Sequence, residues 1–239
     1  MSRYRHYLFD LYGTLADIRT DEESRRVWER TALWYTEQGA PYQGSELRNA
    51  YLRLCAAEQA RSADPLYELE LRRVFRALYA EKGLRAGPRL VEDTAMFFRL
   101  ASRRKLRRYP WVLPVFRQLR AAGAGIYLLS NAQACFTEAE LRVLELDRAF
   151  DGILLSSDAG VKKPNPAILR LLLERYALDP ADCLMVGNEQ AADVGVARTA
   201  GMDALYLRTE TSGPYDPSLR AEYELLDDDF TKIPTLLGL

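Results

Sequence analysis

The stretch YLFDLYGTL, at residues 7–15, is the part of the sequence that most clearly indicates the fold. Its first three residues are apolar and predict a short buried strand, and Gly13 indicates a tight turn soon after the strand ends. Asp10 stands directly at the carboxyl end of this strand. In an open parallel sheet, ligands bind beyond the carboxyl ends of the strands, so Asp10 lies where chemistry is expected.

Downstream of Tyr109-Pro110, short apolar runs alternate with helical patterns. Strands separated by helices of this length favour right-handed crossovers and a parallel sheet. The sequence therefore predicts an α/β fold. The predicted strands cover residues 126–129, 152–155, 183–186 and 204–207, and the predicted helices cover about 111–122, 134–144, 166–176 and 190–200.

Residues 20–108 have a different sequence pattern, with apolar residues at helical spacing and few strand signals. Glycines and prolines divide this segment into four predicted helices. The α/β domain is thus interrupted after its first strand by a helical insertion. The predicted helices cover about 20–38, 45–60, 64–82 and 89–106.

Composition narrows the possible functions of the 239-residue chain. Lys and Arg number 33 and Asp and Glu 34, so no global basic field favours nucleic acid or an anionic membrane. No apolar run approaches the ~18 residues of a membrane span, and the N-terminal residues carry no secretion signal core. Cys55, Cys135 and Cys183 are widely spaced, which argues against a disulfide framework. We therefore expect a cytoplasmic protein.

Polar residues follow the predicted strands of the alternating part, as Asp10 follows the first strand. Because the carboxyl ends of parallel strands meet at one edge of a sheet, these residues would face one crevice. A single aspartate after a strand is commonly a turn residue, whereas this combination of acids, hydroxyls, amides and a lysine is far more specific. The residues are Asp10, Thr14, Ser130, Asn131, Lys163, Asn188, Glu189 and Asp193.

Four blocks of the sequence carry a resemblance to a known family. They are FDLYGTL (9–15), LLSN (128–131), KPNP (163–166) and VGNE (186–189). With these blocks, and with Asp193 after the last of them, the chain resembles the haloacid dehalogenase superfamily of hydrolases. The resemblance implies a Rossmann-like parallel-sheet core, formed by residues 1–18 and 109–239, and an inserted α-helical cap domain at residues 19–108.

The resemblance also implies a role for the residues at the crevice. Asp10 would be the nucleophile that forms a covalent ester or acyl phosphate with the substrate. Thr14 and Ser130 would donate hydrogen bonds to the anionic group of the substrate, assisted by backbone N–H groups near Asn131. Lys163 would neutralise the negative charge of Asp10 and of the substrate.

Tyr12 departs from the phosphatases of the family, which carry a second aspartate two residues after the nucleophile as general acid and base. A phenol with a pKa near ~10 is a poor base at neutral pH. The dehalogenases of the family tolerate tyrosine here, because a halide leaves without a proton. They also need a cap arginine to hold halide or carboxylate, for which Arg48 and Arg53 are candidates. Leu169, however, stands where those dehalogenases carry a further tyrosine.

The spacing within and after the fourth block resembles the metal-binding form of the family. Mg²⁺ prefers oxygen ligands and needs few carboxylates from the protein. Asp193 would hold a metal-bound water. The other implied contributors are Asp10, the backbone carbonyl of Tyr12, and either Asn188 or Glu189.

The residues support three hypotheses about function. The first is Mg²⁺-dependent hydrolysis of a small anionic phosphate ester through an aspartyl-phosphate on Asp10. The second is metal-independent dehalogenation of 2-haloacids with the same nucleophile. The third is a non-catalytic binding protein on a degenerate scaffold of this family, because Tyr12 and Asn188 both replace usual acids. The sequence leaves the substrate and the oligomeric state open.

Overall fold

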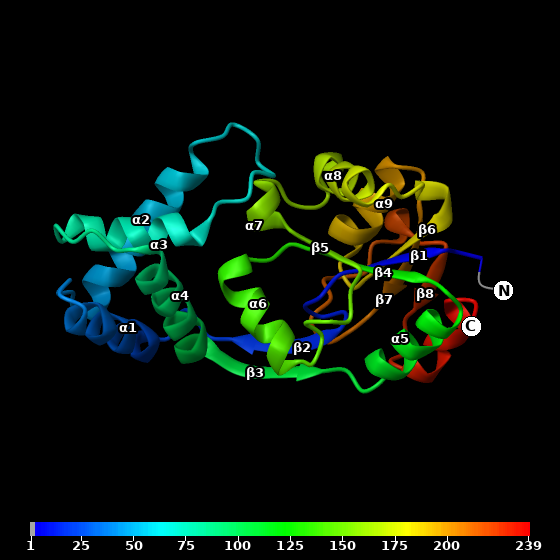
Figure 1. The fold of residues 1–239 in the computed structure, drawn as a ribbon, viewed down its shortest axis with the longest axis horizontal. Coiled ribbons are helices and arrows are strands. Elements are labelled where there is room, and N and C mark those ends of the chain that lie inside the picture. Colours follow the sequence, from blue (N-terminus) through cyan, green and yellow to red (C-terminus); the bar gives the residue numbers. More distant parts are fainter. Residues whose placement is uncertain (1–2) are drawn as a thin grey trace.

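A six-stranded parallel sheet forms the core of the protein, whose structure, a computed structural model, describes residues 3–239 (Figure 1). The strand order is β5-β4-β1-β6-β7-β8, so the first strand of the chain lies in the middle. Phe9 at its end is in register with Leu128 of β4 and Val186 of β6. The polar residues after these three strands therefore lie at one edge. The strands are β1 His6–Phe9, β4 Gly125–Ser130, β5 Gly152–Leu155, β6 Cys183–Gly187, β7 Asp203–Leu207 and β8 Tyr223–Leu225.

Side chains of β1 alternate between the two faces of the sheet, as successive residues of a strand do. Tyr7 and Phe9 belong to one apolar cluster with Phe116 of α5. Leu8 belongs to the cluster on the other face with Ile168 of α8. Helices thus cover both faces, and the predicted Rossmann-like α/β arrangement is confirmed. The helices of this part are α5 Val112–Ala121, α6 Ala134–Val143, α7 Ser156–Ala159, α8 Pro166–Tyr176, α9 Gly195–Thr199 and α10 Ile233–Leu236.

The insertion after β1 forms a helical lobe, at the left of Figure 1, which we refer to as the cap. Its apolar cluster is rich in aromatic rings. The ring of Phe98 lies 5.3 Å from that of Trp28 and 5.7 Å from that of Tyr51, between centroids. Phe136 of the core helix α6 joins the same cluster, so α6 takes part in holding cap and core together. The cap helices are α1 Arg25–Glu37, α2 Gly44–Gln59, α3 Leu71–Glu81 and α4 Pro88–Ser102.

The predicted fourth helix, residues 89–106, is wrong at its carboxyl end. α4 stops at Ser102, and the basic run that follows forms a strand, β3, which pairs antiparallel with β2. Arginine and lysine favour a helix only by a few tenths of a kcal/mol, so the partner strand decides their conformation. Asp17 of β2 forms an ion pair with Lys105 of β3. This ribbon connects core and cap, and the predicted boundary at 18/19 falls inside it. The two strands are β2 Ala16–Thr20 and β3 Arg103–Arg108.

The predicted third helix begins too early. Asp64 accepts a hydrogen bond from the Leu66 N–H in a local turn, and α3 begins only at Leu71. Residues 62–70 instead form a loop. The Leu66 carbonyl in this loop accepts a hydrogen bond from the Lys162 N–H of the core. The predicted helix over 190–200 is present, but it opens with a π-helical turn. That turn is η2 Gln190–Val194. The sequence analysis did not predict the elements α7, β8, α10, η1 Pro180–Asp182, η3 Pro217–Leu219 and η4 Phe230–Lys232.

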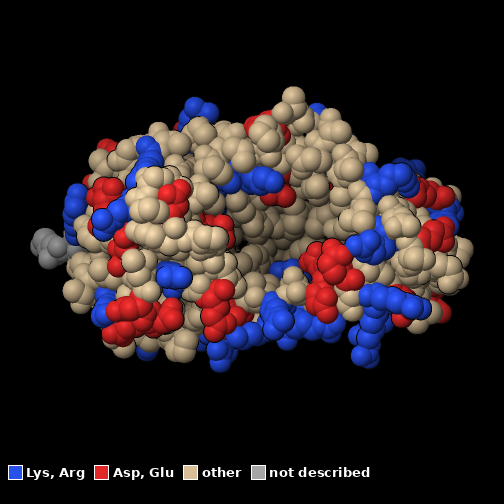
Figure 2. Space-filling view, turned by 180° about the vertical axis from the view of Figure 1, so that it is seen from behind, with Lys and Arg blue, Asp and Glu red and all other residues tan. Residues whose placement is uncertain are grey.

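The view from the reverse side shows a hollow between the cap and the core (Figure 2). Basic side chains gather along the lower edge of this view, where the β2–β3 ribbon lies in Figure 1. Within residues 3–239, none of the helices combines the length and the apolarity that a membrane crossing needs.

Candidate active site

Lys163 holds two carboxylates together at the carboxyl edge of the sheet. Its Nζ donates to Asp10 Oδ1 at 2.8 Å, to Asp193 Oδ1 at 2.6 Å and to the Leu129 carbonyl at 2.8 Å. All three charged side chains are buried. Asp10 follows β1, Lys163 lies in the loop before α8, and Asp193 lies in the π-helical turn after β6. Three distant segments thus meet in one ion cluster.

The Asp10 carboxylate is held in one orientation. The Asp10 N–H donates to the Val186 carbonyl at 2.9 Å, which continues the pairing of β1 with β6. Ser130 Oγ donates to Asp10 Oδ1 at 3.0 Å. Thr14 Oγ1 lies 3.4 Å from Asp10 Oδ2 and 3.1 Å from Asn188 Oδ1. Oδ2 therefore carries fewer hydrogen bonds than Oδ1 and is the less hindered of the two oxygens for attack.

Asn131 positions the backbone of Lys163. Its Nδ2 donates to the Lys163 carbonyl at 3.0 Å, and its Oδ1 accepts from the Lys163 N–H at 2.7 Å. Two residues further on, Asn165 caps α8 by accepting from the Ala167 N–H, with Pro166 in the first turn. Lys163 therefore reaches Asp10 from a backbone that is held on both sides.

Burial and charge shift the titration of this cluster. Burial alone would lower the pKa of Lys163, but Asp10 and Asp193 outweigh it and raise that pKa above its usual value. Burial raises the pKa of Asp193 to about 6, against the opposing effect of Lys163. Gly187 permits this packing, because a Cβ there would collide with the Asp193 carboxylate. Lys163 is therefore charged at neutral pH, while Asp193 takes up a proton at a higher pH than a free aspartate does.

The raised pKa of Asp193 predicts how stability depends on pH. The pKa of this carboxyl is 3.8 in the unfolded chain and about 6 in the fold. Its protonation therefore stabilises the fold fully below pH 3.8, and this contribution is lost as the pH rises through about 6. The unfolding free energy of the wild type minus that of Asp193→Asn should therefore increase as the pH falls from neutral toward the unfolded pKa. Urea unfolding over this range measures it. A difference that stays constant or shrinks would contradict the raised pKa.

Two adjoining cavities connect this cluster with the cap. The first, of about 200 Å³, is lined by the residues of the Lys163 cluster and by Glu189. The second, of about 280 Å³, lies under the cap. Tyr12 and Asn131 line both cavities. The buried cluster therefore opens past these two residues toward the cap.

Tyr12 is not free to act as a base at Asp10. Its hydroxyl donates to Glu140 Oε2 at 2.5 Å and lies 3.0 Å from Thr137 Oγ1. Burial, and next the charge of Glu140, raise the pKa of Tyr12 above its usual value. The guanidinium carbon of Arg99 lies 5.6 Å from the centre of the Tyr12 ring. Tyr12 is therefore a protonated hydrogen-bond donor to Glu140 at neutral pH.

Glu140 and Arg99 form a buried ion pair between core and cap that the sequence analysis missed. Arg99 of α4 donates through Nε to Glu140 Oε1 at 2.8 Å and through Nη2 to Oε2 at 3.2 Å. Arg103 adds a bond to Oε1 at 3.1 Å. Burial alone would raise the pKa of Glu140, but Arg99 outweighs it and lowers that pKa. The sequence held one signal for this ion pair: Glu140 stands at helical spacing from the apolar Phe136.

The structure places Asn188 beside Thr14 and not in the cavity at Asp10. Asn188 Oδ1 accepts from Thr14, and its Nδ2 donates to Thr211 Oγ1 at 3.2 Å. Neither Asn188 nor Thr14 lines that cavity, whereas Glu189 does. Of the two alternatives for a metal ligand, this geometry favours Glu189. The Thr14 hydroxyl lies between Asp10 and Asn188.

The cap arginines expected to hold a halide or carboxylate lie elsewhere. Arg48 forms an ion pair with Glu23, and Arg53 forms one with Glu81. Neither arginine lines the cavity at Asp10 or the cavity under the cap. The arginine that does reach the cavity under the cap is Arg99, on a different helix.

The donor set at the cavity fits Mg²⁺. Asp10, Glu189 and Asp193 present three carboxylates against the single charge of Lys163. Burial, and next the charge of Asp10, raise the pKa of Glu189. No three His, Cys, Asp or Glu residues within 3–239 stand close enough to enclose a metal alone. Mg²⁺ commonly takes one or two carboxylates and completes its octahedron with water and phosphate, so these residues suffice.

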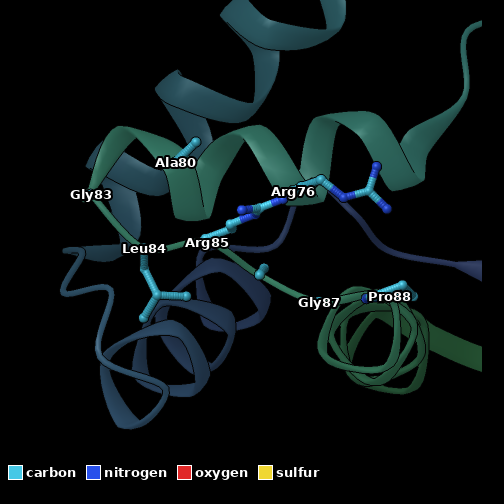
Figure 3. A pocket seen from close by; sticks show the side chains of 8 residues that line it. Arg76, Ala80, Gly83, Leu84, Arg85, Gly87 and Pro88 are labelled. Atoms are coloured by element: carbon cyan, nitrogen blue, oxygen red, sulfur yellow. The ribbon is translucent and has the colours of Figure 1, made fainter.

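A larger hollow, of about 650 Å³, lies on the cap, and its lining shares no residue with the cavity at Asp10 (Figure 3). Arg76 of α3 and Arg85 of the following loop lie along it. Both arginines are exposed. Its lining contains no carboxylate, hydroxyl or thiol, so it offers no group for catalysis.

A helical cap over a Rossmann-like core, with a buried Asp–Lys–Asp cluster at the carboxyl edge of the core sheet, is the arrangement of a hydrolase of the haloacid dehalogenase type. Residues 4–201 match the family model of haloacid dehalogenase-like hydrolases. The chain belongs to this family.

Relatives of known chemistry include both phosphatases and dehalogenases. The chain is 26% identical to a glyceraldehyde 3-phosphate phosphatase of Pyrococcus furiosus, over 99% of this chain and 93% of that enzyme. It is 32% identical to a phosphoserine phosphatase of Thermus thermophilus, but the match spans 56% of this chain and only about half (53%) of that relative. A solved 2-haloacid dehalogenase of Pseudomonas syringae shares the fold, with a TM-score of 0.67 and 24% identity over 98% of both chains.

Proposed function

We propose that this protein hydrolyses small phosphate esters through an aspartyl-phosphate on Asp10. The observation that carries the proposal is the Lys163 Nζ between Asp10 and Asp193, at 2.8 and 2.6 Å. This position puts a fixed positive charge beside the attacking carboxylate and beside the phosphoryl group that it would receive. The match with phosphatases along the chain supports the same reaction.

The reaction takes two displacements at phosphorus. In the first, an oxygen of Asp10 attacks, the bond from phosphorus to the leaving oxygen breaks, and an acyl phosphate forms. The released alkoxide takes a proton from solvent. In the second, water attacks phosphorus and loses a proton, the bond from phosphorus to Asp10 breaks, and inorganic phosphate leaves. Ser130 orients the carboxylate, and Lys163 offsets the negative charge throughout.

When bound, Mg²⁺ would neutralise the phosphoryl oxygens and help to align them with the nucleophile. Asp10, Glu189 and, through its carbonyl, Tyr12 would hold it directly, and Asp193 would hold one of its waters. Because the Tyr12 hydroxyl is bound to Glu140, it gives no proton to the leaving group. We therefore expect esters of acidic alcohols and phenols to react faster than esters of simple alcohols.

Metal removal tests the proposal. With Mg²⁺ present, the protein should release p-nitrophenol from p-nitrophenyl phosphate, whose leaving group needs no proton donor. EDTA should lower this rate by about 100-fold or more, because a catalytic metal contributes several kcal/mol, and added Mg²⁺ should restore it. Absorbance of the phenolate measures both rates. A rate unaffected by EDTA would contradict the metal, and no hydrolysis of any phosphate ester would contradict the reaction.

Dehalogenation of 2-haloacids is the second candidate. Tyr12 favours it, because no carboxylate stands two residues after Asp10. The cap argues against it, since Arg99 is already bound to Glu140 and is not free to hold the carboxylate of a haloacid. Chloride release from 2-chloropropionate, unaffected by EDTA, would support this candidate. Either activity, if lost in Asp10→Asn, would exclude a non-catalytic binding protein.

A further inference from the structure

The cavity under the cap has more negative than positive side chains. It measures about 280 Å³, and its charged lining residues are Glu22, Glu68 and Arg99. It lies between the cap and the core, where Figure 2 shows the hollow. Tyr12 and Asn131 join it to the cavity at Asp10. An acidic cavity therefore adjoins the cavity at Asp10.

The charge of Arg99 is already balanced by the protein. Its Nε and Nη2 donate to Glu140 at 2.8 and 3.2 Å, and its Nη1 lies 3.6 Å from Glu22 Oε1. The ring of Phe136 lies against the guanidinium, whose carbon is 5.1 Å from the ring centre. A carboxylate on the substrate would have to compete with two glutamates for this one arginine. Arg99 therefore does not make the cavity a site for a second anion.

The two cavity glutamates keep capacity to accept hydrogen bonds. Glu68 accepts from Gln133 Nε2 and from Ser156 Oγ, both at 2.9 Å, and within the described chain it forms no ion pair. Among residues 3–239, Glu22 forms an ion pair only with Arg99, at 3.6 Å, which is beyond hydrogen-bond distance. A carboxylate accepts about four hydrogen bonds, so both side chains can still bind a cation.

The loop that carries Glu68 is tied to the core. The Glu68 N–H donates to the Gly160 carbonyl at 3.1 Å, and the Lys162 N–H donates to the Leu66 carbonyl at 2.9 Å. Asn165 Nδ2 also donates to Asp64 Oδ2 at 2.9 Å. These bonds hold Glu68 next to the segment that carries the active-site lysine. Its carboxylate is therefore placed before a ligand arrives, which lowers the entropic cost of binding.

We propose that the cavity under the cap selects phosphate esters whose leaving group carries an ammonium, bound by Glu22 and Glu68. The inference rests on the proposed phosphate-ester hydrolysis for its reaction, while the preference for charge follows from this cavity alone. An ammonium has three donors for the two carboxylates. A carboxylate or a second phosphate at the same place would face like charge in a partly desolvated site. The substrate class is thus a small aminoalkyl phosphate.

Three two-carbon esters test this preference, because they are close in size and differ in the charge at the end remote from the phosphate. O-phosphoethanolamine ends in an ammonium, 2-hydroxyethyl phosphate in a hydroxyl and phosphoglycolate in a carboxylate. Calorimetry with Asp10→Asn protein and Mg²⁺ measures binding without turnover. We expect the ammonium ester to bind about tenfold more tightly than the hydroxyl ester, as one charge-assisted hydrogen bond allows, and the carboxylate ester to bind most weakly.

A pair of variants, each made in the Asp10→Asn protein, assigns the preference to the cavity. Glu22→Gln should bring the affinities of the ammonium and hydroxyl esters toward equality. Glu23→Gln makes the same change at the next residue, whose carboxylate pairs with Arg48 outside the cavity, and should leave the preference intact. The proposal would be overturned if the Asp10→Asn protein itself bound the ammonium and hydroxyl esters equally, bound phosphoglycolate more tightly, or did not bind O-phosphoethanolamine. Equal effects of Glu22→Gln and Glu23→Gln would overturn it as well.

The substrate preference and the reaction can fail separately. If the binding order holds but no ester, p-nitrophenyl phosphate included, is hydrolysed, the cavity preference stands and the proposed reaction falls. If p-nitrophenyl phosphate is hydrolysed and O-phosphoethanolamine is not preferred, the reaction stands and the cavity preference falls.

Discussion

Replacing Asp10 with Asn is expected to lower kcat/KM for p-nitrophenyl phosphate by at least about 1,000-fold, the scale of loss when a covalent nucleophile is removed. An amide cannot form the acyl phosphate, because its nitrogen and oxygen are far weaker nucleophiles than a carboxylate. Asn is close in shape to Asp and still presents an oxygen to Ser130 and Lys163. Initial rates at saturating and limiting substrate measure the loss.

Two further observations separate lost chemistry from lost structure. Asp21→Asn makes the same change at a surface ion pair with Arg104 and should leave kcat/KM within about twofold, because surface substitutions have small effects. Asp10→Asn should keep the circular dichroism spectrum of the parent. If Asp10→Asn retains turnover of the same order as Asp21→Asn, Asp10 is not the nucleophile.

Replacing Lys163 with Met should damage both stability and activity. Asp10 and Asp193 would be left buried without the ammonium that lies 2.8 and 2.6 Å from them. Removing one partner of a buried ion pair costs about 3–5 kcal/mol, because the remaining charge is uncompensated. Urea unfolding at neutral pH measures this loss. Turnover should fall by about 100-fold or more, because the fixed charge beside the phosphoryl group is lost.

Acid should partly rescue the stability of Lys163→Met. Protonation removes the negative charge of the stranded carboxylates, so the deficit relative to the wild type should shrink as the pH falls below neutral. Lys162→Met is the matched control, since within the described residues the side chain of Lys162 forms no ion pair. Its backbone N–H donates to Leu66 and its carbonyl accepts from Asn165, and the substitution keeps both bonds. It should cost less than about 0.5 kcal/mol. Equal losses in the two variants, or a deficit that grows in acid, would refute the role of the buried cluster.

Local signals located the strands and the polar residues that follow them. The predicted strands at 126–129 and 183–186 correspond to β4 and β6, because apolar runs bounded by turn residues depend on neighbours in the sequence. The β2–β3 ribbon could not be predicted in this way. Its second strand is a run of basic residues. The conformation of this run depends on a partner strand that precedes the cap helices in the chain, whereas the run follows them. Pairing with that partner outweighs the weak helix preference of the run.

On the cap side of the site, too, the local sequence did not predict which residue contacts the core. Arginines are frequent in the insertion, and periodicity alone did not distinguish Arg48 from Arg99. In the fold, Arg48 forms an outer ion pair, while Arg99 reaches a buried glutamate of α6. The decisive quantity is the distance from each side chain to a carboxylate on another element, and helical spacing carries no information about it.

The residue pattern was enough to predict an α/β core that is interrupted by a helical insertion. It also predicted an aspartate and a serine at the ends of core strands and a lysine in a loop before a helix. Each of these features depends on residues within a few positions of one another. Which polar groups pair became clear only in the folded chain: Tyr12 with Glu140, Asn188 with Thr14, and Lys163 with two aspartates at once. Electrostatic and hydrogen-bond energies depend on separations of a few ångströms between segments far apart in the chain, and the fold alone sets those separations.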